Sequence, residues 1–452
     1  MTTSSNPTNR LPVDLGHGLI LRRSSPQDAQ ALSDLHARVL SEEGIDKPDE
    51  RIWAWTHDLL TKPHPTFKPD NFTIVEDVSK GQIVSSMSLI PQVWAYSGIP
   101  FKVGRPELVS TLPEYRNRGL VRHQFNLIHQ WSAQNGDLLQ AITGIPYFYR
   151  LFGYEMAMNL GGGRLGYPAN IPRLKKGEEE PYHLRQAGVD DIPFISELYA
   201  MGCKRSMVAC QWDEALWRYE LIGKSENNVN RGVVQLIETQ DSKPCGYIMH
   251  DAFRWGDRMV LKAYELVPGL SWLEVNPSVM RYLERTYEQY HPERGENKPF
   301  GAFGFWMGED HPAYHVMYDH IPQTRRPYAW YLRVSDVPGF LKLIRPVLEQ
   351  RLAMSPMAGY SGEVKITFYR DGVRLVLDKG ILVTIEDWKP TPVGHTGEVA
   401  FPPHTFLQLL FGYRNMGMLK QNFADCWTER DDIEALLDAL FPRQPSNVSA
   451  IS

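Results

Sequence analysis

Residues 107–122 read ELVSTLPEYRNRGLVR and decide the fold of the surrounding chain. A strand-like apolar run ends at Thr111, and a turn that ends at Gly119 leads into a helix with apolar residues at helical spacing. Glycine at the bend lets the backbone approach a ligand closely, and the start of a helix offers unpaired N–H groups with a partial positive charge. Three arginines add charge at the rim: Arg116, Arg118 and Arg122. The segment therefore predicts a cradle for a pyrophosphate group.

This segment is not one of the common nucleotide-binding loops, because it has neither the GxxxxGK[ST] nor the GxGxxG spacing. After the helix comes a strand-like run at residues 138–142, followed by YRLFGY at residues 149–154. The alternatives are an ordinary solvated helix start for the arginine-glycine turn and a packed core aromatic for Tyr149. The upstream strand, Gly119 and the YRLFGY segment together favour a ligand site.

The opening of the chain is repeated at the scale of a domain. Leu21-Arg22 corresponds to Leu184-Arg185, and without a gap Asp28 corresponds to Asp191. In both places a strand, a polar cap and an amphipathic helix follow one another, which favours an internal duplication over chance similarity. The strand and helix near residues 259–287 have no Arg-x-x-Gly turn between them. The second copy therefore lacks the predicted cradle.

The cradle has the form Arg116-x-x-Gly119-x-Val121. It resembles the acetyl-CoA signature of the GCN5-related N-acetyltransferases (GNAT), usually Gln/Arg-x-x-Gly-x-Gly/Ala, from which Val121 departs. The 149–154 segment is similar to the second signature of that fold, an aromatic residue before a Gly-aromatic pair. The domain order resembles the enhanced-intracellular-survival (Eis) acetyltransferases. The resemblance implies an α/β and α+β fold: tandem GNAT folds, each a mixed central sheet flanked by helices, followed by a sterol-carrier-protein-2-like α+β domain.

We expect six segments along the chain. They are a disordered tail at 1–16, an active GNAT domain at 17–172, a charged linker at 173–181, a degenerate GNAT domain at 182–335, a sterol-carrier-like domain at 336–442 and a C-terminal tail at 443–452. A strong hairpin signal at Asp371-Gly372 marks the third domain. Its apolar residues 406–411 are expected to form core, with a lipid cavity as the alternative.

The resemblance assigns roles to the residues that match its motifs. Tyr149 would be the general acid that protonates the departing thiolate, since a phenol can donate a proton to a developing thiolate. Acetyl-CoA would be bound by the strand residues Val109, Ser110 and Thr111, the turn and helix residues Asn117, Arg118, Gly119, Leu120, Val121 and Arg122, and the strand-end residues Gly144 and Ile145.

The nucleophile would be an amine, which must lose a proton before it attacks. In the resembled family the C-terminal carboxylate is the base, but the polar end of this chain makes that role doubtful for Ser452. Glu42, Glu43 and Glu107, acting through water, are the alternatives. We expect direct transfer to a small cationic molecule, such as a polyamine or an aminoglycoside-like amine. A protein lysine as acceptor, or a lipid- or small-molecule-binding protein with inactive transferase domains, are the competing hypotheses.

Composition narrows the setting further. The chain has 452 residues and a net charge of −5, so a global basic field for nucleic acid is absent. No run of 18 apolar residues and no signal-peptide pattern is present, so we expect a cytoplasmic protein without a membrane partner. No metal is expected, because the four cysteines form no CxxC pair and His311 and His315 have no third ligand nearby. The resemblance implies a homohexamer, and an aromatic content of 11 % is compatible with large interfaces.

Overall fold

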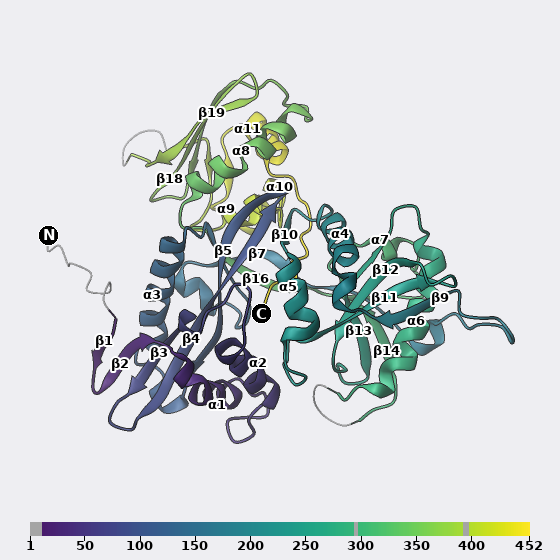
Figure 1. Ribbon diagram of the computed structural model, residues 1–452. Helices are drawn as coiled ribbons and strands as arrows, with labels where there is room; N and C mark the ends of the chain where they lie inside the picture. The colour runs from purple at the N-terminus through teal and green to yellow at the C-terminus, as the bar shows by residue number, and fades with distance from the viewer. Residues whose placement is uncertain (1–10, 293–296, 392–396) are drawn as a thin grey trace.

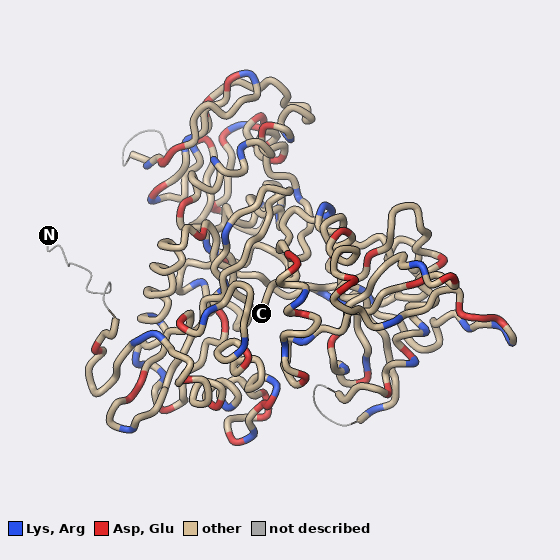
Figure 2. Tube along the Cα trace, viewed as in Figure 1, with Lys and Arg blue, Asp and Glu red and all other residues tan. Residues whose placement is uncertain are grey.

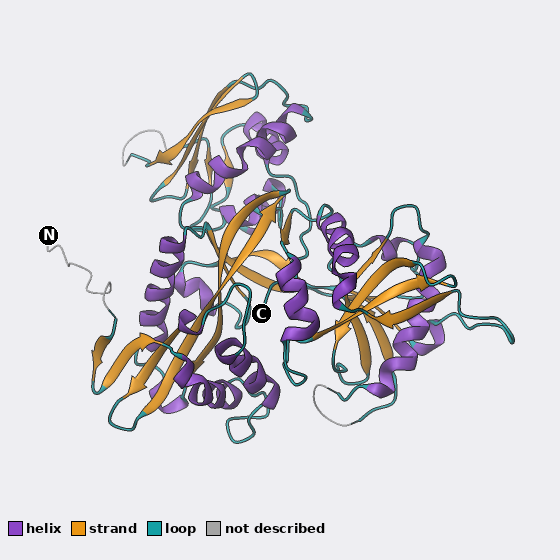
Figure 3. Cartoon of the chain, viewed as in Figure 1, coloured by secondary structure: helices purple, strands orange, loops and turns teal. Residues whose placement is uncertain are grey.

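The computed structural model describes residues 11–292, 297–391 and 397–452. It has three lobes, each built on its own β-sheet (Figure 1). Helices accompany all three sheets, which gives the expected mixture of α/β and α+β architecture (Figure 3). Charged residues of both signs are interspersed over the three lobes (Figure 2). Among the described residues, no helix combines the length and the apolar character needed to span a bilayer.

The first sheet has the strand order β1-β2-β3-β4-β5-β6-β16-β7, and β10 pairs with β4. Its strands are β1 (Val13–Gly16), β2 (Leu19–Arg23), β3 (Phe72–Asp77), β4 (Gln82–Tyr96), β5 (Ile99–Thr111), β6 (Leu139–Ile142), β7 (Glu155–Leu160), β10 (Val208–Cys210) and β16 (Tyr328–Arg333). Helices α1 (Ala29–Val39), α2 (Glu50–Thr61) and α3 (Leu120–Asn135) share its apolar core. The strand and helix expected on either side of the cradle are thus β5 and α3.

The second sheet has the order β15-β8-β14-β13-β12-β11-β9. Its strands are β8 (Gly163–Gly166), β9 (Tyr182–Gln186), β11 (Gly232–Thr239), β12 (Pro244–Asp251), β13 (Arg258–Leu266), β14 (Ala302–Phe305) and β15 (Gln323–Arg325). Its helices are α4 (Ile192–Cys203), α5 (Glu214–Arg218), α6 (Trp272–Thr286) and α7 (Pro312–His315). As in the first sheet, one strand, β13, leads into the longest helix of the unit, α6.

The third sheet has the order β19-β18-β17-β20-β21 and lies in a separate lobe (Figure 1). Its strands are β17 (Gly362–Thr367), β18 (Gly372–Asp378), β19 (Ile381–Trp388), β20 (Val399–Ala400) and β21 (Trp427–Thr428), and its helices are α8 (Val337–Ala353), α9 (Phe406–Leu410), α10 (Met416–Asn422) and α11 (Asp431–Leu440). All five residues of α9 are buried, so this apolar run forms core as expected.

The duplicated opening is visible as a repeated ion-pair network. In the first unit, Arg22 forms two hydrogen bonds to Asp28, at 2.8 and 2.9 Å, and one to Glu76 at 2.9 Å. In the second unit, Arg185 forms two bonds of the same lengths to Asp191 and one to Glu238 at 2.7 Å. Because Glu76 and Glu238 lie on β3 and β11, each network ties the strand that carries the arginine, β2 or β9, to the adjacent strand and to the following helix.

The two units exchange strands. The chain leaves the first sheet after β7 and enters the second as β8, between β14 and β15. It returns as β16, which lies antiparallel between β6 and β7 of the first sheet. The crossing at residues 161–163 is three glycines, and a Cβ on Gly163 would lie 2.1 Å from the Phe305 carbonyl oxygen. Boundaries at 172 and 335 therefore divide the sequence but not the sheets, because hydrogen bonding between distant strands is not encoded locally.

Both ends of the chain are more ordered than expected where the structure describes them. The predicted tail at 1–16 contains β1, which pairs with β2; residues 1–10 lie outside the described residues. In the C-terminal tail, Val448 and Ile451 are buried. The Gln92 side chain donates a 2.7 Å bond to the Ile451 carbonyl, and the Trp212 indole donates a 2.9 Å bond to that of Ser449. Apolar side chains within a polar sequence are enough to anchor this segment between the first two lobes.

The linker at 173–181 is also anchored at its end rather than wholly solvated. The Glu180 carboxylate pairs with Arg281, and it accepts bonds from Arg285 at 3.0 Å and from the Ser278 hydroxyl at 2.6 Å. Burial would raise the pKa of Glu180, but these three partners outweigh it and lower that pKa to about 2. The linker is therefore joined to α6 by a charged contact.

Candidate active site

The site begins where β5 separates from β6. These parallel strands pair only at Val103–Leu139 and Gly104–Gln140, so the rest of β5 diverges and leaves the space between the strands open. Leu108 has a φ of +54° and is buried, and the β4–β5 register shifts at this point. An extra residue of this kind is a β-bulge, which bends a strand and reorients its side chains. Val109 and Thr111, which follow the bulge, line this opening.

The cradle follows directly. Gly119 caps α3 with a φ of +77°, and Asn117 also lies in the left-handed region at +62°. A Cβ on Gly119 would have no atom within 4 Å, so the turn faces open space. No side chain caps α3, which leaves its first N–H groups available to an anion. This geometry matches the pyrophosphate cradle predicted from the sequence.

A cavity of about 580 Å³ extends from the cradle along β5, and we call it the donor groove. It is lined by Val39, Leu40, Val109, Thr111, Tyr115, Arg116, Asn117, Gly119, Leu120, Val121, Arg122, Ile145, Phe148, Tyr149, Leu151 and Phe152. An uncapped helix start with two arginines suits a pyrophosphate, and the apolar walls suit an elongated acyl carrier arm. The residues present therefore fit acetyl-CoA.

Most of the predicted binding residues lie in the donor groove, and three do not. Ser110 is buried, and its side chain points away from the donor groove because side chains alternate in direction along β5. Arg118 turns back to donate a 3.0 Å bond to the Glu114 carbonyl and lies over the Tyr115 ring. Gly144 lies behind Tyr149, where a Cβ would be 3.2 Å from the phenol oxygen. Sequence reasoning missed Val39 and Leu40, which reach the groove from the end of α1 and carry no motif.

Tyr149 lies in a 3₁₀ helix, Phe148–Phe152, at the inner end of the donor groove. Only 5 % of the residue is exposed, and within the described part of the chain no hydrogen bond holds its hydroxyl. The expected alternative, a core tyrosine bonded to a backbone carbonyl, is therefore not observed. Burial raises the pKa of Tyr149 well above 10, and the charges of Glu107 and Tyr328 raise it further. The phenol therefore stays protonated and keeps a proton that it can donate.

A second cavity, of about 500 Å³, lies between the first two lobes, and we call it the interdomain cavity. It is lined by Arg105, Thr143, Leu160, Gly161, Trp212, Glu220, Lys224, Asn230, Met249, Trp255, Lys262, Ala263, Trp306, Arg325, Tyr328, Trp330, Asn447, Val448, Ser449, Ala450 and Ser452. These residues come from both sheets and from the C-terminal tail. No local signal in the sequence could have grouped them, because the strand exchange brings them together.

The two cavities approach each other around Glu107. Its carboxylate pairs with Arg105 and accepts a 3.4 Å bond from Thr143, and both of these line the interdomain cavity. Tyr328, on the exchanged strand β16, donates a hydrogen bond to the Gly144 carbonyl beside Tyr149. Glu107 therefore lies between the interdomain cavity and Tyr149.

The other candidate bases lie elsewhere. Glu42 and Glu43 line a separate surface depression, where Glu43 pairs with Lys47 at 3.4 Å. Ser452 lines the interdomain cavity, and the Ile451 carbonyl next to it accepts a 2.7 Å bond from Arg105. Of the four candidates, Glu107 and Ser452 are thus near the site and the other two are not.

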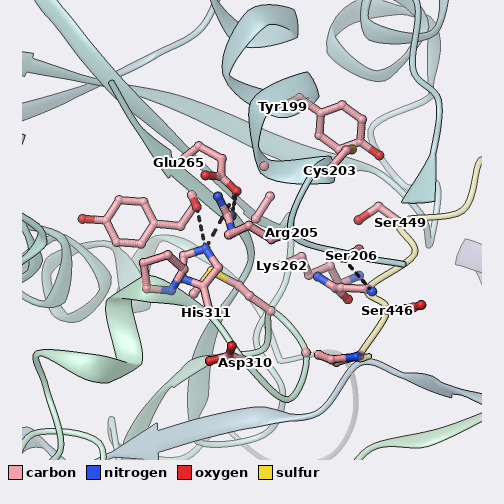
Figure 4. Close-up of a pocket in the computed structure, with 18 of the residues that line it drawn as sticks. Tyr199, Cys203, Arg205, Ser206, Lys262, Glu265, Asp310, His311, Ser446 and Ser449 are labelled. Carbon is pink, nitrogen blue, oxygen red and sulfur yellow. Dashed lines mark hydrogen bonds and ion pairs between the residues drawn. The ribbon is translucent and has the colours of Figure 1, made fainter. Parts of the chain in front are cut away.

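In the second unit, side chains of that unit fill much of the region that corresponds to the donor groove. Its helix α6 begins at Trp272, whose ring packs against Tyr264 and edge-on against His311, with ring centroids 4.7 and 5.1 Å apart. His311 faces Glu265 and Arg205, with Ser446 and Ser449 of the C-terminal tail nearby (Figure 4). The cavity that remains there is only about 180 Å³.

The His311–His315 pair has the bonding of structural residues. One ring nitrogen of His311 donates to the Tyr264 carbonyl at 3.0 Å, and the other accepts from the Ala313 amide at 3.2 Å. The His315 ring is exposed and lies 2.7 Å from Asp310. Within the described ranges, no group of three or more His, Cys, Asp or Glu side chains is arranged to hold a metal ion.

Comparisons with known proteins agree with this geometry. The family model for the acetyltransferase (GNAT) domain matches residues 21–157, which include the cradle and Tyr149. A search of curated proteins finds no significant match.

Among solved structures, a probable N-acyltransferase from Enterococcus faecalis V583 is 13 % identical, with a TM-score of 0.65 over 96 % of this chain and 100 % of that one. A GCN5-related N-acetyltransferase from Kribbella flavida is 17 % identical (TM-score 0.63; 96 % and 98 % covered), and Eis1 from Mycobacterium abscessus is 14 % identical (TM-score 0.57; 94 % and 98 %). At such identities the likeness shows a shared fold. Together with the family match, it leads to one conclusion: the chain carries a GNAT acetyltransferase domain over residues 21–157 and is an acetyl-CoA-dependent N-acetyltransferase.

Proposed function

We propose that the chain transfers an acetyl group directly from acetyl-CoA in the donor groove to an amine held in the interdomain cavity. One observation carries this proposal: two cavities of different character approach each other at Glu107, beside a buried phenol whose hydroxyl has no hydrogen-bond partner among the described residues. A direct transfer needs both substrates to reach one point from opposite sides. The acceptor expected from the sequence is a small cationic amine.

The donor groove would bind acetyl-CoA through the backbone of α3 and through Arg116 and Arg122 at its rim. Val109 and Thr111, next to the bulge, would align the carrier arm along β5. Bound acetyl-CoA supplies the acyl group as an activated thioester. The apolar walls around Phe148 and Phe152 exclude water and so limit hydrolysis of that thioester.

Tyr149 is the proposed general acid. Its raised pKa keeps the proton on the phenol in the resting site, and a phenol donates its hydrogen bond most strongly to a full negative charge. A thiol has an ordinary pKa of about 8.5, so the departing sulfur develops that charge as the bond to the acetyl group breaks. The donor is thus matched to the leaving group and not to the intact thioester, as rate enhancement requires.

Glu107 is the proposed acceptor of the amine proton, directly or through water. An alkylammonium has a pKa of about 10.4 and must lose a proton before it attacks. Glu107 lies beside the interdomain cavity and is positioned by Arg105 and Thr143. The Ser452 carboxylate is the competing base, and an E107Q variant separates the two. If Glu107 is the base, kcat falls by about 100-fold and the alkaline rise of the pH–rate profile moves to higher pH.

The proposal is tested by titrating acetyl-CoA into the purified protein by calorimetry and then adding a panel of amines while free CoA thiol is measured. Binding of one acetyl-CoA per chain followed by amine-dependent thiol release is the expected result. The panel includes peptides with a single lysine, which tests the protein-lysine alternative. An absence of acetyl-CoA binding would overturn the transferase proposal and leave lipid binding by the third domain as the function to test.

We propose a homohexamer from the Eis-like domain order, and light scattering of the purified chain would measure its mass. We also propose a cytoplasmic location, because four cysteines in 452 residues suit a reducing compartment, and cell fractionation would check it.

A further inference from the structure

The side chains that line the interdomain cavity include more cations than anions. Among those described, four are cationic and one, Glu220, is acidic, and the main-chain carboxylate of Ser452 adds a second negative charge. The cations are Arg105, Lys224, Lys262 and Arg325. The side chains therefore bear on which amine the enzyme takes.

Three of the four cations already have a carboxylate partner. Arg105 pairs with Glu107, Lys262 with Asp251, and the buried Lys224 with the equally buried Glu220. These three contacts neutralise their charges within the protein. The fourth cation of the cavity has no such carboxylate partner among the described residues.

Arg325 is that cation. Its guanidinium lies 3.8 Å above the Trp306 ring, and in the described chain no side-chain hydrogen bond or ion pair satisfies it. Burial lowers the pKa of Arg325, and the like charge of Arg258 lowers it further, so the protein holds this cation at a cost. An arginine remains charged under such conditions, and its planar fork binds carboxylate or phosphate through two parallel bonds. A half-buried arginine at a cavity wall, with no carboxylate partner among the described residues, is thus suited to bind an anionic group.

The remaining walls are aromatic. Trp212, Trp255, Trp306, Trp330 and Tyr328 line the same cavity. Aromatic walls favour a flat apolar body, and tryptophan rings also contact ammonium groups well. Arg325 belongs to the second sheet, whereas Thr143 and Tyr328 belong to the first lobe beside Glu107. A ligand that spans the cavity can therefore place an anion at one wall and an amine at the other.

We propose that the acceptor is an alkylamine that carries an aromatic ring and also a carboxylate or a phosphate group, and that Arg325 binds this anionic group. The inference rests on the proposed function, because it takes the interdomain cavity as the acceptor site. It goes beyond that function by replacing the expected polycation with an amine that bears an anion. Arg325 is accordingly a specificity residue and takes no part in proton transfer.

The test measures binding to the full-length protein by calorimetry for five ligands: tyramine, tyrosine, tyrosine methyl ester, O-phosphotyrosine and spermidine. We expect tyrosine, O-phosphotyrosine or both to bind at least about tenfold more tightly than tyramine, spermidine or the ester, the range of one charge-assisted bidentate contact. Tyrosine above its methyl ester assigns the anion to a carboxylate, and a preference for O-phosphotyrosine alone assigns it to a phosphate. Spermidine or tyramine binding as tightly as both anionic ligands would overturn the proposal.

Variants at position 325 locate the preference. Arg325→Gln should reduce it to about twofold or less, whereas Arg325→Lys should keep its direction because the charge remains. Arg164→Gln is the matched control: Arg164 lies on the neighbouring strand, donates a 2.9 Å bond to Thr324 and does not line the cavity. A preference that survives Arg325→Gln, or that Arg164→Gln also abolishes, contradicts the assignment to Arg325. The five wild-type measurements decide the ligand class even if a variant fails to fold.

Thiol release with the same ligands separates this inference from the function beneath it. An anion preference in binding without thiol release from any amine would remove the proposed function and leave the ligand class intact. Acetylation of amines without an anion preference would contradict the ligand class and leave the proposed function intact.

Discussion

The two N-terminal units share a strand–helix plan and an identical arginine network, yet only one presents a site. In the first unit, residues 112–119 connect β5 to α3, and the helix start is open. In the second, residues 267–271 connect β13 to α6, and Trp272, the first residue of α6, packs against Tyr264 and His311. The Arg22 and Arg185 networks belong to the shared scaffold, whereas the connection after the central strand is where the proposed phosphate cradle differs between the units. Fold and activity are thus carried by different residues.

The largest effect that would sharpen this comparison is expected at Tyr149. Tyr149→Phe removes the proton donor and should lower kcat by about 100-fold or more, with little change in acetyl-CoA binding. Tyr264→Phe in the second unit is the control, since that buried hydroxyl has no hydrogen-bond partner among the described residues. Steady-state kinetics and calorimetry measure both. Full kcat in Tyr149→Phe would remove the acid from the mechanism.

The second-largest effect is expected when a carboxylate is introduced into the β5–α3 connection, and the same change in the β13–α6 connection should have little effect. Gly119→Glu places a negative charge at the cradle and should weaken acetyl-CoA binding at least tenfold, equal to about 1.4 kcal/mol. Gly269→Glu is closely matched, because both glycines have positive φ, +77° and +87°, and neither would bring a Cβ within 4 Å of another atom. Calorimetry should show normal binding for Gly269→Glu. Equal losses in both variants would show that strain, and not the cradle, causes the effect.

The shared scaffold should respond unequally to loss of the arginine partner. Asp28 is buried and accepts additional bonds from Ser25, so Asp28→Asn should destabilise the first unit by about 2–3 kcal/mol. The Arg185–Asp191 pair is more exposed, and Asp191→Asn should cost the second unit about 1 kcal/mol. Hydrogen-exchange mass spectrometry reports on the two units separately. A larger effect at Asp191 would contradict the inferred difference in burial.

The contact between the linker and α6 should contribute to stability in a pH-dependent way. The folded-state pKa of Glu180, about 2, lies below its ordinary 4.5. Its contribution to stability is therefore complete above pH 4.5 and is lost as the pH falls toward 2. Glu180→Gln should cost about 1–2 kcal/mol at pH 7, with allowance for screening by solvent, and less at pH 3. Denaturant unfolding at both pH values checks this, and a cost that grows at low pH would have the wrong sign.

The sequence predicted the donor groove well because its residues are local. The strand, the turn at Gly119 and the segment around Tyr149 span fewer than fifty residues, and each follows from spacing and glycine chemistry. Leu40 was missed because an apolar residue at a helix end has no distinguishing pattern. The interdomain cavity could not be predicted, since Trp212, Trp306 and Arg325 meet only through the exchange of β8 and β16. Position in space, and not residue type, makes them a site.

The exchanged strand β16 also affects how the protein is made. The first sheet has a place between β6 and β7 that is filled only by residues 328–333. Translation proceeds from the N-terminus at roughly 5–20 residues per second. During synthesis, β6 and β7 of the first lobe therefore lack the strand between them until the second lobe has been made. Unpaired strands of this kind are open to wrong partners. The first lobe is thus translated first, but its sheet is complete only after residues 328–333 have been synthesised.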